Sequence, residues 1–127
     1  MSTMTSFKIK KMSLQFIVAD IEHSIEFYRN KLGFDLEFRY KDFYAGLVKD
    51  GYSIHLKCGE PSLEERSNKR KNNDLDIVFS VEDVEALYRE FVNKPIEIIQ
   101  PLCERPYGKE FYIADPDGYM LAFLEEV

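Results

Sequence analysis

Apolar residues in the first half of the chain recur with the period of a strand and then with that of a helix. Residues 13–18 carry leucine, phenylalanine and valine at every second position, which predicts a half-buried strand. Asp20 follows as a helix N-cap, and the next apolar residues keep helical spacing up to Gly33: Ile21, Ile25, Tyr28 and Leu32. Three short strands are predicted at about 34–39, 42–48 and 51–58. This half therefore predicts a βαβββ unit.

The second half repeats the same order of elements. A strand at 75–81 precedes a helix whose apolar residues lie at i, i+3, i+4 and i+7, namely Val84, Leu87, Tyr88 and Phe91. Strands at about 95–99, 109–114 and 119–125 follow, with a tight turn at 115–118 before the last one. Short sequences echo as well: VADIE and DGY in the first half correspond to VEDVE and DGY in the second, 63 and 67 positions later. We predict two copies of one unit, 12–58 and 74–126, that share one core in a single domain spanning 1–127.

The segment 59–73 between the two units is charged and almost free of apolar residues. It predicts an exposed and mobile connector. Its basic cluster, Lys69 to Lys71, is interpreted as a solvated loop, with a binding patch as the less favoured alternative.

The alternation also gives four of the predicted strands two different faces. One face is uniformly apolar and suits packing beneath the helices: Leu14/Phe16/Val18, Ile54/Leu56, Ile77/Phe79/Val81 and Leu121/Phe123. The other face is chemically mixed: Ser13/Gln15/Ile17, Ser53/His55/Lys57, Asp76/Val78/Ser80 and Met120/Ala122/Leu124. The mixed face is compatible either with a concave ligand cavity or with a simply solvated surface. We expect an α+β fold of tandem βαβββ modules, with mixed sheets curled around a concave cavity and a helix on the outer face of each module.

Composition and charge exclude several classes of function. Seventeen Lys and Arg against 23 Asp and Glu give a net charge of −6, the wrong sign for binding a phosphate backbone, so we expect no nucleic-acid partner. No run of about 18 apolar residues could span a bilayer and no secretory signal is evident, so we expect no membrane partner and a cytoplasmic location. Cys58 and Cys103 are expected to be free thiols.

Tandem βαβββ units with Asp-Pro-Asp-Gly-Tyr before the last strand resemble the vicinal oxygen chelate superfamily, which includes glyoxalase I, extradiol dioxygenases and bleomycin resistance proteins. The resemblance extends from Met12 to Glu126 and rests on VADIEHSIEFY at 18–28, LGF at 32–34 and DPDG at 115–118, in this order. The segments DFYAGLV at 42–48 and ERPYGKEF at 104–111 look like the bleomycin resistance branch. That narrower resemblance implies a homodimer that sequesters a cationic drug in grooves between subunits, without metal or chemistry.

Enzymes of the superfamily hold a divalent metal with one inward residue from each of four strands. By spacing from the shared motifs, these positions correspond here to Ser13, His55, Asp76 and Ala122. Ala122 has no ligand atom and Ser13 offers only a neutral hydroxyl, whereas a catalytic metal site needs about three protein ligands. The sequence therefore predicts no complete metal site, and we expect no bound metal, no cofactor and no catalytic residue.

Six residues are candidates for binding a ligand. His55 should face the cavity, and contact with a ligand or with solvent is favoured over a role as metal ligand or base, because no nucleophile arrangement can be placed around it. Asp76 and Glu110 could meet a cationic ligand; the alternatives are a solvated carboxylate and a cross-strand ion pair. Aromatic surface for flat or cationic groups, or otherwise for the core or a dimer contact, comes from Tyr40, Phe43, Tyr44, Tyr107, Phe111 and Tyr112. Of these, Phe43, Tyr107 and Phe111 are the candidates for ligand contact.

The sequence therefore predicts a small-molecule-binding protein of the bleomycin resistance type, a homodimer that sequesters a cationic or aromatic ligand. The alternative is a metal-dependent lyase, isomerase or dioxygenase of the same superfamily, against which Ser13 and Ala122 argue. A module that senses a ligand or binds a protein cannot be separated from the first reading by sequence, and the identity of the ligand stays open.

Overall fold

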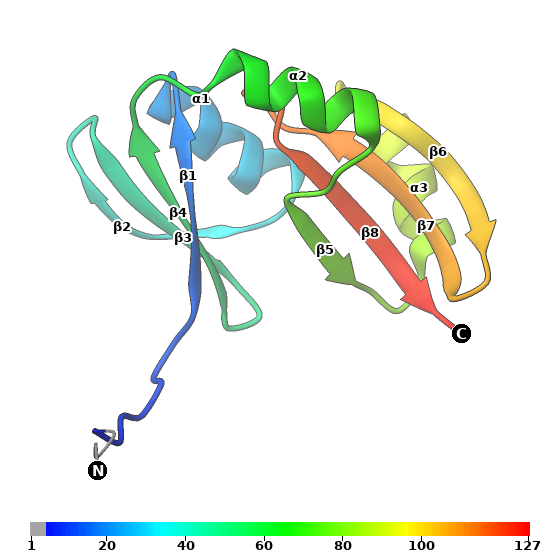
Figure 1. The fold of residues 1–127 in the computed structure, drawn as a ribbon, viewed down its shortest axis with the longest axis horizontal. Coiled ribbons are helices and arrows are strands. Elements are labelled where there is room, and N and C mark those ends of the chain that lie inside the picture. Colours follow the sequence, from blue (N-terminus) through cyan, green and yellow to red (C-terminus); the bar gives the residue numbers. More distant parts are fainter. Residues whose placement is uncertain (1–4) are drawn as a thin grey trace, which may run out of the picture.

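A computed structural model describes residues 5–127 and shows two modules built in the same way (Figure 1). The first module runs β1 (Ser13–Val18), α1 (Ile21–Glu26), the π-helical segment η1 (Phe27–Lys31), β2 (Asp35–Tyr40), β3 (Tyr44–Lys49) and β4 (Tyr52–Cys58). After α2 (Leu63–Asn72), the second runs β5 (Ile77–Ser80), α3 (Val84–Val92), β6 (Glu97–Arg105), β7 (Gly108–Ala114) and β8 (Met120–Glu126). No helix within residues 5–127 is long and apolar enough to cross a membrane.

The two sheets have equivalent topologies. Their strand orders are β1-β4-β3-β2 and β5-β8-β7-β6, and in each the first strand pairs in parallel with the last while the other pairs are antiparallel. The predicted α+β fold of two βαβββ modules is therefore confirmed. Strand β6 is longer than predicted because it lies at a sheet edge, where Pro101 and two irregularities in its pairing with β7 are tolerated.

The first helix changes its winding part-way along. The Asp20 side chain accepts a hydrogen bond from the His23 amide and so caps α1, as predicted. From Phe27 the helix widens into η1 and ends before Gly33, which adopts a φ of +79°. Phe27 and Tyr28 are both buried as a result, although α-helical spacing predicted only the second of them to face the core.

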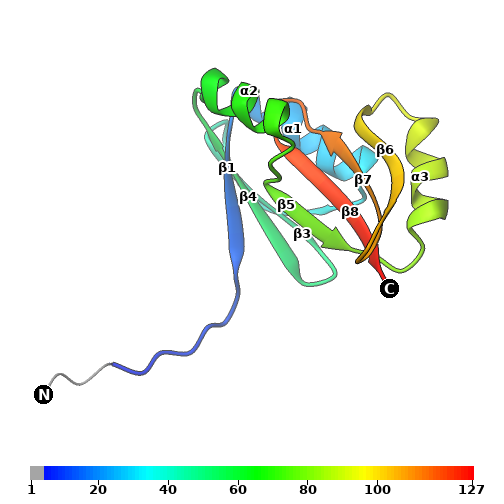
Figure 2. The ribbon, with the colours of Figure 1, turned by 45° about the vertical axis from the view of Figure 1, so that its right-hand side comes forward.

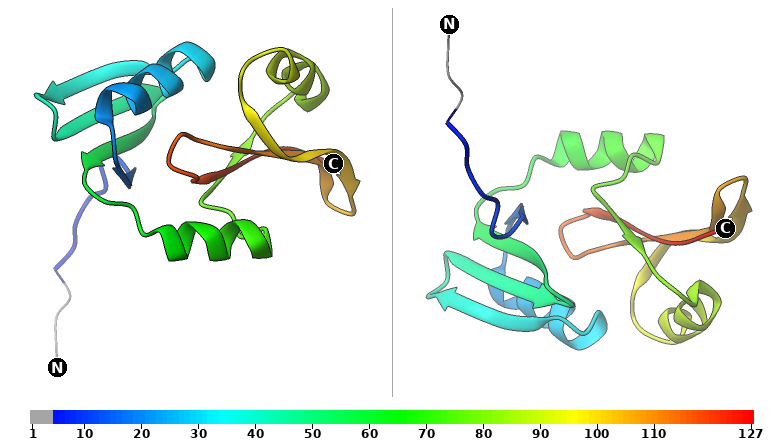
Figure 3. Two further views of the ribbon diagram at one scale, coloured as in Figure 1. Left: turned by 90° about the horizontal axis from the view of Figure 1, so that it is seen from above. Right: turned by 90° about the horizontal axis from the view of Figure 1, so that it is seen from below.

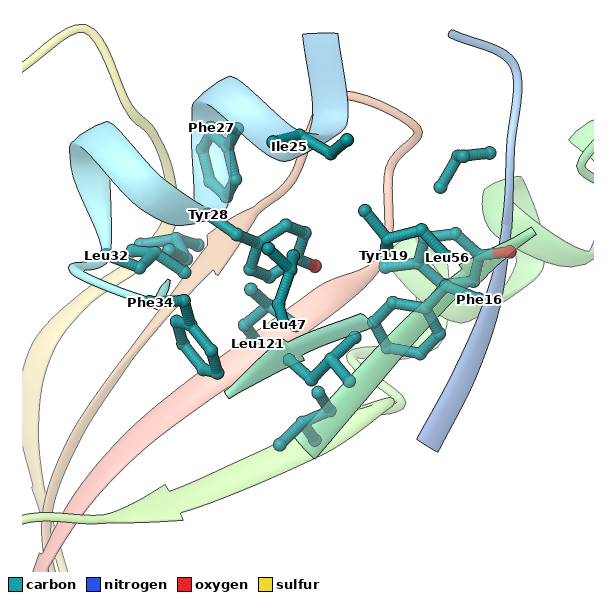
Figure 4. Close-up of a cluster of buried hydrophobic side chains, with 14 of the residues drawn as sticks. Phe16, Ile25, Phe27, Tyr28, Leu32, Phe34, Leu47, Leu56, Tyr119 and Leu121 are labelled. Atoms are coloured by element: carbon teal, nitrogen blue, oxygen red, sulfur yellow. The ribbon is translucent and has the colours of Figure 1, made fainter. Parts of the chain in front are cut away.

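One hydrophobic core joins the modules. The apolar faces of both sheets point into it, so that Phe16 of β1 stacks on Tyr119, the residue before β8, with ring centroids 4.0 Å apart. Figure 4 shows side chains of the first module, such as Leu47, facing Leu121 of the second. The mixed faces of the two sheets consequently point away from this core, although Met120, Ala122 and Leu124 on the second sheet are buried.

The segment predicted as a mobile connector contains a helix instead. Helix α2 begins after Ser62, whose side chain caps the Glu65 amide, and it ends at Asn73 in the left-handed conformation. It lies on the side of the molecule opposite α1 and α3 (Figure 3). The helix is largely exposed, as predicted, but Arg66 is buried over the Tyr119 ring, 4.0 Å from its centroid, and donates to Asp76 across 2.7 Å.

The turn between β7 and β8 binds the first module directly. Asp117 accepts hydrogen bonds from the Ala19 amide and the Ser24 hydroxyl. The Tyr119 hydroxyl donates to the Ile17 carbonyl across 2.7 Å and accepts from the Ile17 amide. The DPDGY motif therefore holds the two modules together, a role that its turn propensity alone did not indicate.

Candidate functional site

An aromatic cluster covers the outer face of the first sheet. We call this surface, formed by Phe38, Tyr40, Phe43, Tyr44 and His55, the aromatic face. The Phe38 ring stacks on Tyr44 at 6.0 Å and meets the edge of His55 at 5.2 Å. Tyr40 and Phe43 are 58% and 59% exposed, so a large area of ring surface is open to a ligand or a partner.

Gly46 provides the space in which the Phe38 ring lies. Gly46 of β3 is opposite His55 of β4 in the strand register, and the ring covers its Cα. A Cβ at this position would lie 2.1 Å from Phe38 Cε2. Phe38 can therefore lie flat between Tyr44 and His55 only because residue 46 has no side chain.

A short chain of hydrogen bonds orients the His55 ring. Gln15 Nε2 donates to Tyr44 Oη across 3.0 Å, and Tyr44 Oη lies 2.9 Å from His55 Nδ1. The contact with Tyr44 occupies Nδ1, and no hydrogen bond within residues 5–127 reaches Nε2. Nε2 is therefore the ring nitrogen with which a bound molecule can interact.

The equivalent face of the second sheet holds a buried carboxylate. Glu110 of β7 is 2% exposed, and its Oε2 atom accepts hydrogen bonds from Arg105 Nε at 3.0 Å, Tyr107 Oη at 2.8 Å and Tyr112 Oη at 2.6 Å. We call these four residues the Glu110 cluster. Gly108, with a φ of +149°, makes the β6–β7 turn that brings Arg105 and Tyr107 back over Glu110.

These contacts shift the pKa values of the cluster in opposite directions. Burial alone would raise the pKa of Glu110, but the three hydrogen bonds outweigh it and hold the pKa below its ordinary value. Burial and the hydrogen bond to Glu110 raise the pKa of Tyr112 to about 12. At neutral pH the cluster therefore contains an ionised Glu110 paired with Arg105 and two neutral phenols.

One oxygen of Glu110 remains free. All three donors reach Oε2, and no hydrogen bond within residues 5–127 reaches Oε1. Among the described side chains, the only fully buried polar atom without a partner is the Ser53 hydroxyl, so Glu110 Oε1 must touch solvent. It is an acceptor that a bound molecule can reach.

The chain matches the sequence model of the glyoxalase/bleomycin resistance protein/dioxygenase superfamily over residues 12–123. It belongs to that superfamily. A bleomycin resistance protein from Geobacillus stearothermophilus is 28% identical over 124 residues, covering 87% of this chain and 92% of the relative.

Solved structures share the fold at lower sequence identity. UcmS2 superposes with a TM-score of 0.76 at 20% identity, covering 94% of this chain and all of that one. A bleomycin-binding protein from Streptomyces verticillus, in complex with copper(II)-bleomycin, gives a TM-score of 0.70 at 20% identity and covers 96% of this chain and 100% of its own.

The metal positions of the superfamily's enzymes do not form a site in this chain. Asp76 is bound by Arg66 at 2.7 Å and by Lys69 at 2.6 Å, so its oxygens are already satisfied by cations of α2. Ala122 is fully buried and has no donor atom, and Ser13 is exposed. Within residues 5–127 no three His, Cys, Asp or Glu side chains are grouped to hold a metal ion. A divalent cofactor does not fit these residues.

The structure places four of the six candidate ligand residues in two groups. His55 and Phe43 lie on the aromatic face, and Tyr107 and Glu110 form part of the Glu110 cluster. Asp76 is placed elsewhere, because Arg66, Lys69 and the Met120 amide hold it as a structural ion pair. These hydrogen bonds lower the pKa of Asp76, although burial opposes them.

Phe111 also lies away from the outer faces. It is fully buried, with its ring 5.1 Å from Tyr88 and 5.8 Å from Phe91 of α3. Because successive side chains of a strand point to opposite faces, Phe111 packs under the helix when Glu110 faces outward. Its expected stacking on a ligand is replaced by a role in the core.

Sequence reasoning missed three residues of these surfaces. Phe38 could have been found from its two-residue spacing to Tyr40 on one strand, together with a glycine on the next. Arg105 was quoted only as part of a motif, and its ion pair with Glu110 depends on the β6–β7 turn. Nothing in the sequence indicated that Gln15 would orient Tyr44.

Proposed function

We propose that this protein binds an antibiotic-like small molecule on its outer sheet faces and sequesters it, as a homodimer, without chemistry. The ligand would be flat, with hydrogen-bonding groups, and aromatic or cationic. The observation that carries this proposal is that two polar atoms beside open aromatic rings have no hydrogen bond within residues 5–127: Nε2 of His55 and Oε1 of Glu110. Both are held in place by neighbours, which limits the entropy cost of binding.

The comparisons support an antibiotic as the class of ligand. The curated relative at 28% identity is named a bleomycin resistance protein, and a structural neighbour binds copper(II)-bleomycin. The surfaces themselves suit such a molecule, since exposed aromatic rings bind flat groups and cations. The absence of a fitting ligand set for a metal favours sequestration over the superfamily's metal-dependent reactions.

Exposed apolar groups support a dimer. Tyr40, Phe43 and Tyr107 are each about half exposed on the outer faces. Residues 5–12, before β1, extend away from the modules in Figures 1 and 2 and include Phe7 and Ile9, which are 77% and 63% exposed. A second copy that covers these groups would also close each open face into a groove.

The test of binding is calorimetry with copper(II)-bleomycin, followed by mass spectrometry of the recovered ligand. We expect saturable binding, recovery of the ligand unchanged, and affinity reduced at least about tenfold by Phe38→Ala or Glu110→Gln. Leu63→Ala, at an 81% exposed position of α2, is the matched control and should bind like the parent. A chemically altered ligand would show an enzyme instead. If F38A and E110Q both bind the ligand as tightly as the parent protein does, the ligand binds elsewhere.

Light scattering tests the dimer separately. A homodimer gives twice the chain mass of 15.0 kDa at micromolar concentration, and replacing Phe7 and Ile9 with serine should shift the mass toward the monomer. A parent protein that stays near 15.0 kDa would contradict this part of the proposal.

A further inference from the structure

A cavity of 710 Å³ lies between the two modules, apart from both outer faces. Its walls come from the end of η1 and the residues after it, the β3–β4 turn, the edge strand β5, helix α3 and Phe123 of β8. None of the residues that line it belongs to the aromatic face or to the Glu110 cluster. Its volume is in the range of sites that enclose a drug-sized molecule.

The inner wall of this cavity is aromatic. Phe79 stacks on Phe123 with centroids 5.0 Å apart and meets the edge of Phe34 at 6.3 Å. Phe91 of α3 adds a ring 5.3 Å from Phe123. These side chains come from the apolar faces of both modules, so an apolar molecule that enters the cavity would complete a core that the two modules leave partly open.

Three lysines surround the cavity. Lys31 Nζ donates to the Pro95 carbonyl across 2.8 Å, while Lys94 Nζ donates to the Lys31 carbonyl across 3.2 Å. Lys31 thus contacts the residue after Lys94, and Lys94 contacts the backbone of Lys31. The two ammonium groups therefore lie at the same end of the cavity. The third, Lys49, lies on the β3–β4 turn.

Two of these lysines have long ion pairs with acids that also line the cavity. Lys49 Nζ lies 3.9 Å from Asp50 and Lys94 Nζ lies 4.0 Å from Glu90. The side chains of Asp50 and Glu90 are 81% and 59% exposed, which weakens both pairs, and Asp83 caps the Ala86 amide of α3. No ion pair within residues 5–127 involves Lys31, so its charge is the one among the three lysines without a carboxylate partner.

We infer that this cavity is a second binding site, for an amphipathic organic anion. The apolar body of the ligand packs against Phe34, Phe79 and Phe123, and its carboxylate binds the ammonium groups of Lys31 and Lys94. The site is independent of the antibiotic-binding faces, and it has the opposite charge preference from the cationic ligand expected there.

A single tryptophan can report on this cavity, because the chain contains none. Tyr52 lines the cavity, shares a face of β4 with Ile54 and is 75% exposed, so Tyr52→Trp places an indole on the cavity wall without disturbing the core. We expect 12-bromododecanoate, below its micellar concentration, to quench this fluorescence saturably by heavy-atom contact. The trimethylammonium compound with the same brominated chain should bind at least about tenfold more weakly. Phe43→Trp, on the aromatic face, is the matched control and should not be quenched at the same concentrations.

Lysine variants test the anion contact. In the Y52W protein, Lys31→Gln with Lys94→Gln should weaken binding of the bromoacid about tenfold, whereas Lys31→Arg with Lys94→Arg should restore it. Lys57→Gln, at an exposed lysine of β4 outside the cavity, should change nothing. If the double glutamine variant fails to fold, Lys49→Gln serves instead, with an expected loss of about threefold. Calorimetry with dodecanoate should give the same affinity for the unaltered protein as for Y52W.

Three results would overturn the inference. They are equal quenching by the anionic and the cationic probe, quenching of F43W without quenching of Y52W, and unchanged affinity in the variants of Lys31, Lys94 and Lys49. Each of them can occur whether or not the protein binds copper(II)-bleomycin, so failure of this site is distinguishable from failure of the proposed function.

Discussion

The hydroxyl of Tyr28 in the first module donates a hydrogen bond to Asp115 Oδ2 in the second across 2.7 Å. The two residues are 87 positions apart and both are buried. The other oxygen of Asp115 accepts from the Asp117 and Tyr119 amides, which shapes the turn whose side chains bind Ile17 and Ala19. A single carboxylate thus joins the π-helical segment to the turn that connects the modules.

Asp115 should make stability depend on pH. Burial raises its pKa to about 6 from 3.8, even though its hydrogen bonds to Tyr28 and two amides favour the charged form. Between about pH 4 and 6 the folded state holds a proton that the unfolded state has lost, so the free energy of unfolding falls by roughly 3 kcal/mol as pH rises through this window. Asp115→Asn removes this titrating group, so the free energy of unfolding of the variant should be nearly constant across the same pH window.

Urea unfolding at a series of pH values measures this dependence. Glu110 and Asp76 have lowered pKa values, so their stabilisation is lost only as pH falls below the same window. The difference between parent and D115N therefore isolates Asp115. Asp35→Asn, at an exposed carboxylate, should give the parent curve. If the stability of the parent protein follows that of D115N from pH 4 to 6, Asp115 is not the group that titrates in this window.

Arg66 should hold α2 in place. The helix has little apolar surface, and this side chain makes both the ion pair with Asp76 and the contact with Tyr119. Arg66→Ala leaves the buried Asp76 with Lys69 and the Met120 amide as its partners and should lower the free energy of unfolding by about 2–4 kcal/mol. Amides of α2 should lose most of their protection in hydrogen exchange, while those of β8 keep theirs. Lys71→Ala, at an exposed position further along α2, is the control and should change neither the stability nor the protection of the helix.

Gly46→Ala should disrupt the aromatic face more than the fold. The added Cβ meets the Phe38 ring, which can swing toward solvent, so we expect a stability loss of about 1 kcal/mol and a changed near-ultraviolet circular dichroism spectrum. In a Phe38→Ala background the same substitution should cost almost nothing. If the two losses simply add, the ring does not lie over Gly46 in solution.

The charge of Glu110 should determine the titration of Tyr112. In Glu110→Gln the hydrogen bond to a carboxylate and its charge are lost, so the pKa of Tyr112 should fall from about 12 toward the ordinary value of 10.0. Tyrosine labelled with carbon-13 at Cζ and followed by NMR resolves this residue from the others. Glu104→Gln, an exposed neighbour in β6, should leave its titration unchanged. A pKa unaffected by E110Q would mean that burial alone sets it.

Much of the fold could be predicted because it depends on local periods. Two-residue alternation identified Phe16, Leu56 and Leu121 as core residues, and all three are buried. Helix α2 was not predicted, because its segment lacks the helical spacing of apolar residues that identified the other helices. Its signals were the Ser62 cap three residues before Glu65, acidic residues in the first turn and basic residues in the last.

The ligand surfaces could be predicted only in part. Alternation required Glu110 and Phe111 to face opposite ways, so one of them had to leave the predicted site. Which one depended on α3, which packs on Phe111 and leaves Glu110 on the outer face with Arg105 and Tyr112. Asp76 resembled a cavity carboxylate in the alternation, and only the position of α2 paired it with Arg66.

The sequence by itself determined the order of strands and helices within each module, the duplication and the resemblance to a superfamily, since each depends on residues close together in the chain. Tertiary structure decided which charges are neutralised, which rings remain open and where a cavity lies between the modules. The physical reason is the difference between local interactions along the backbone and contacts between residues far apart in the chain. Backbone geometry imposes its period on every neighbouring residue, whereas the pairing of Tyr28 with Asp115 or Arg66 with Asp76 exists only after separate elements have packed.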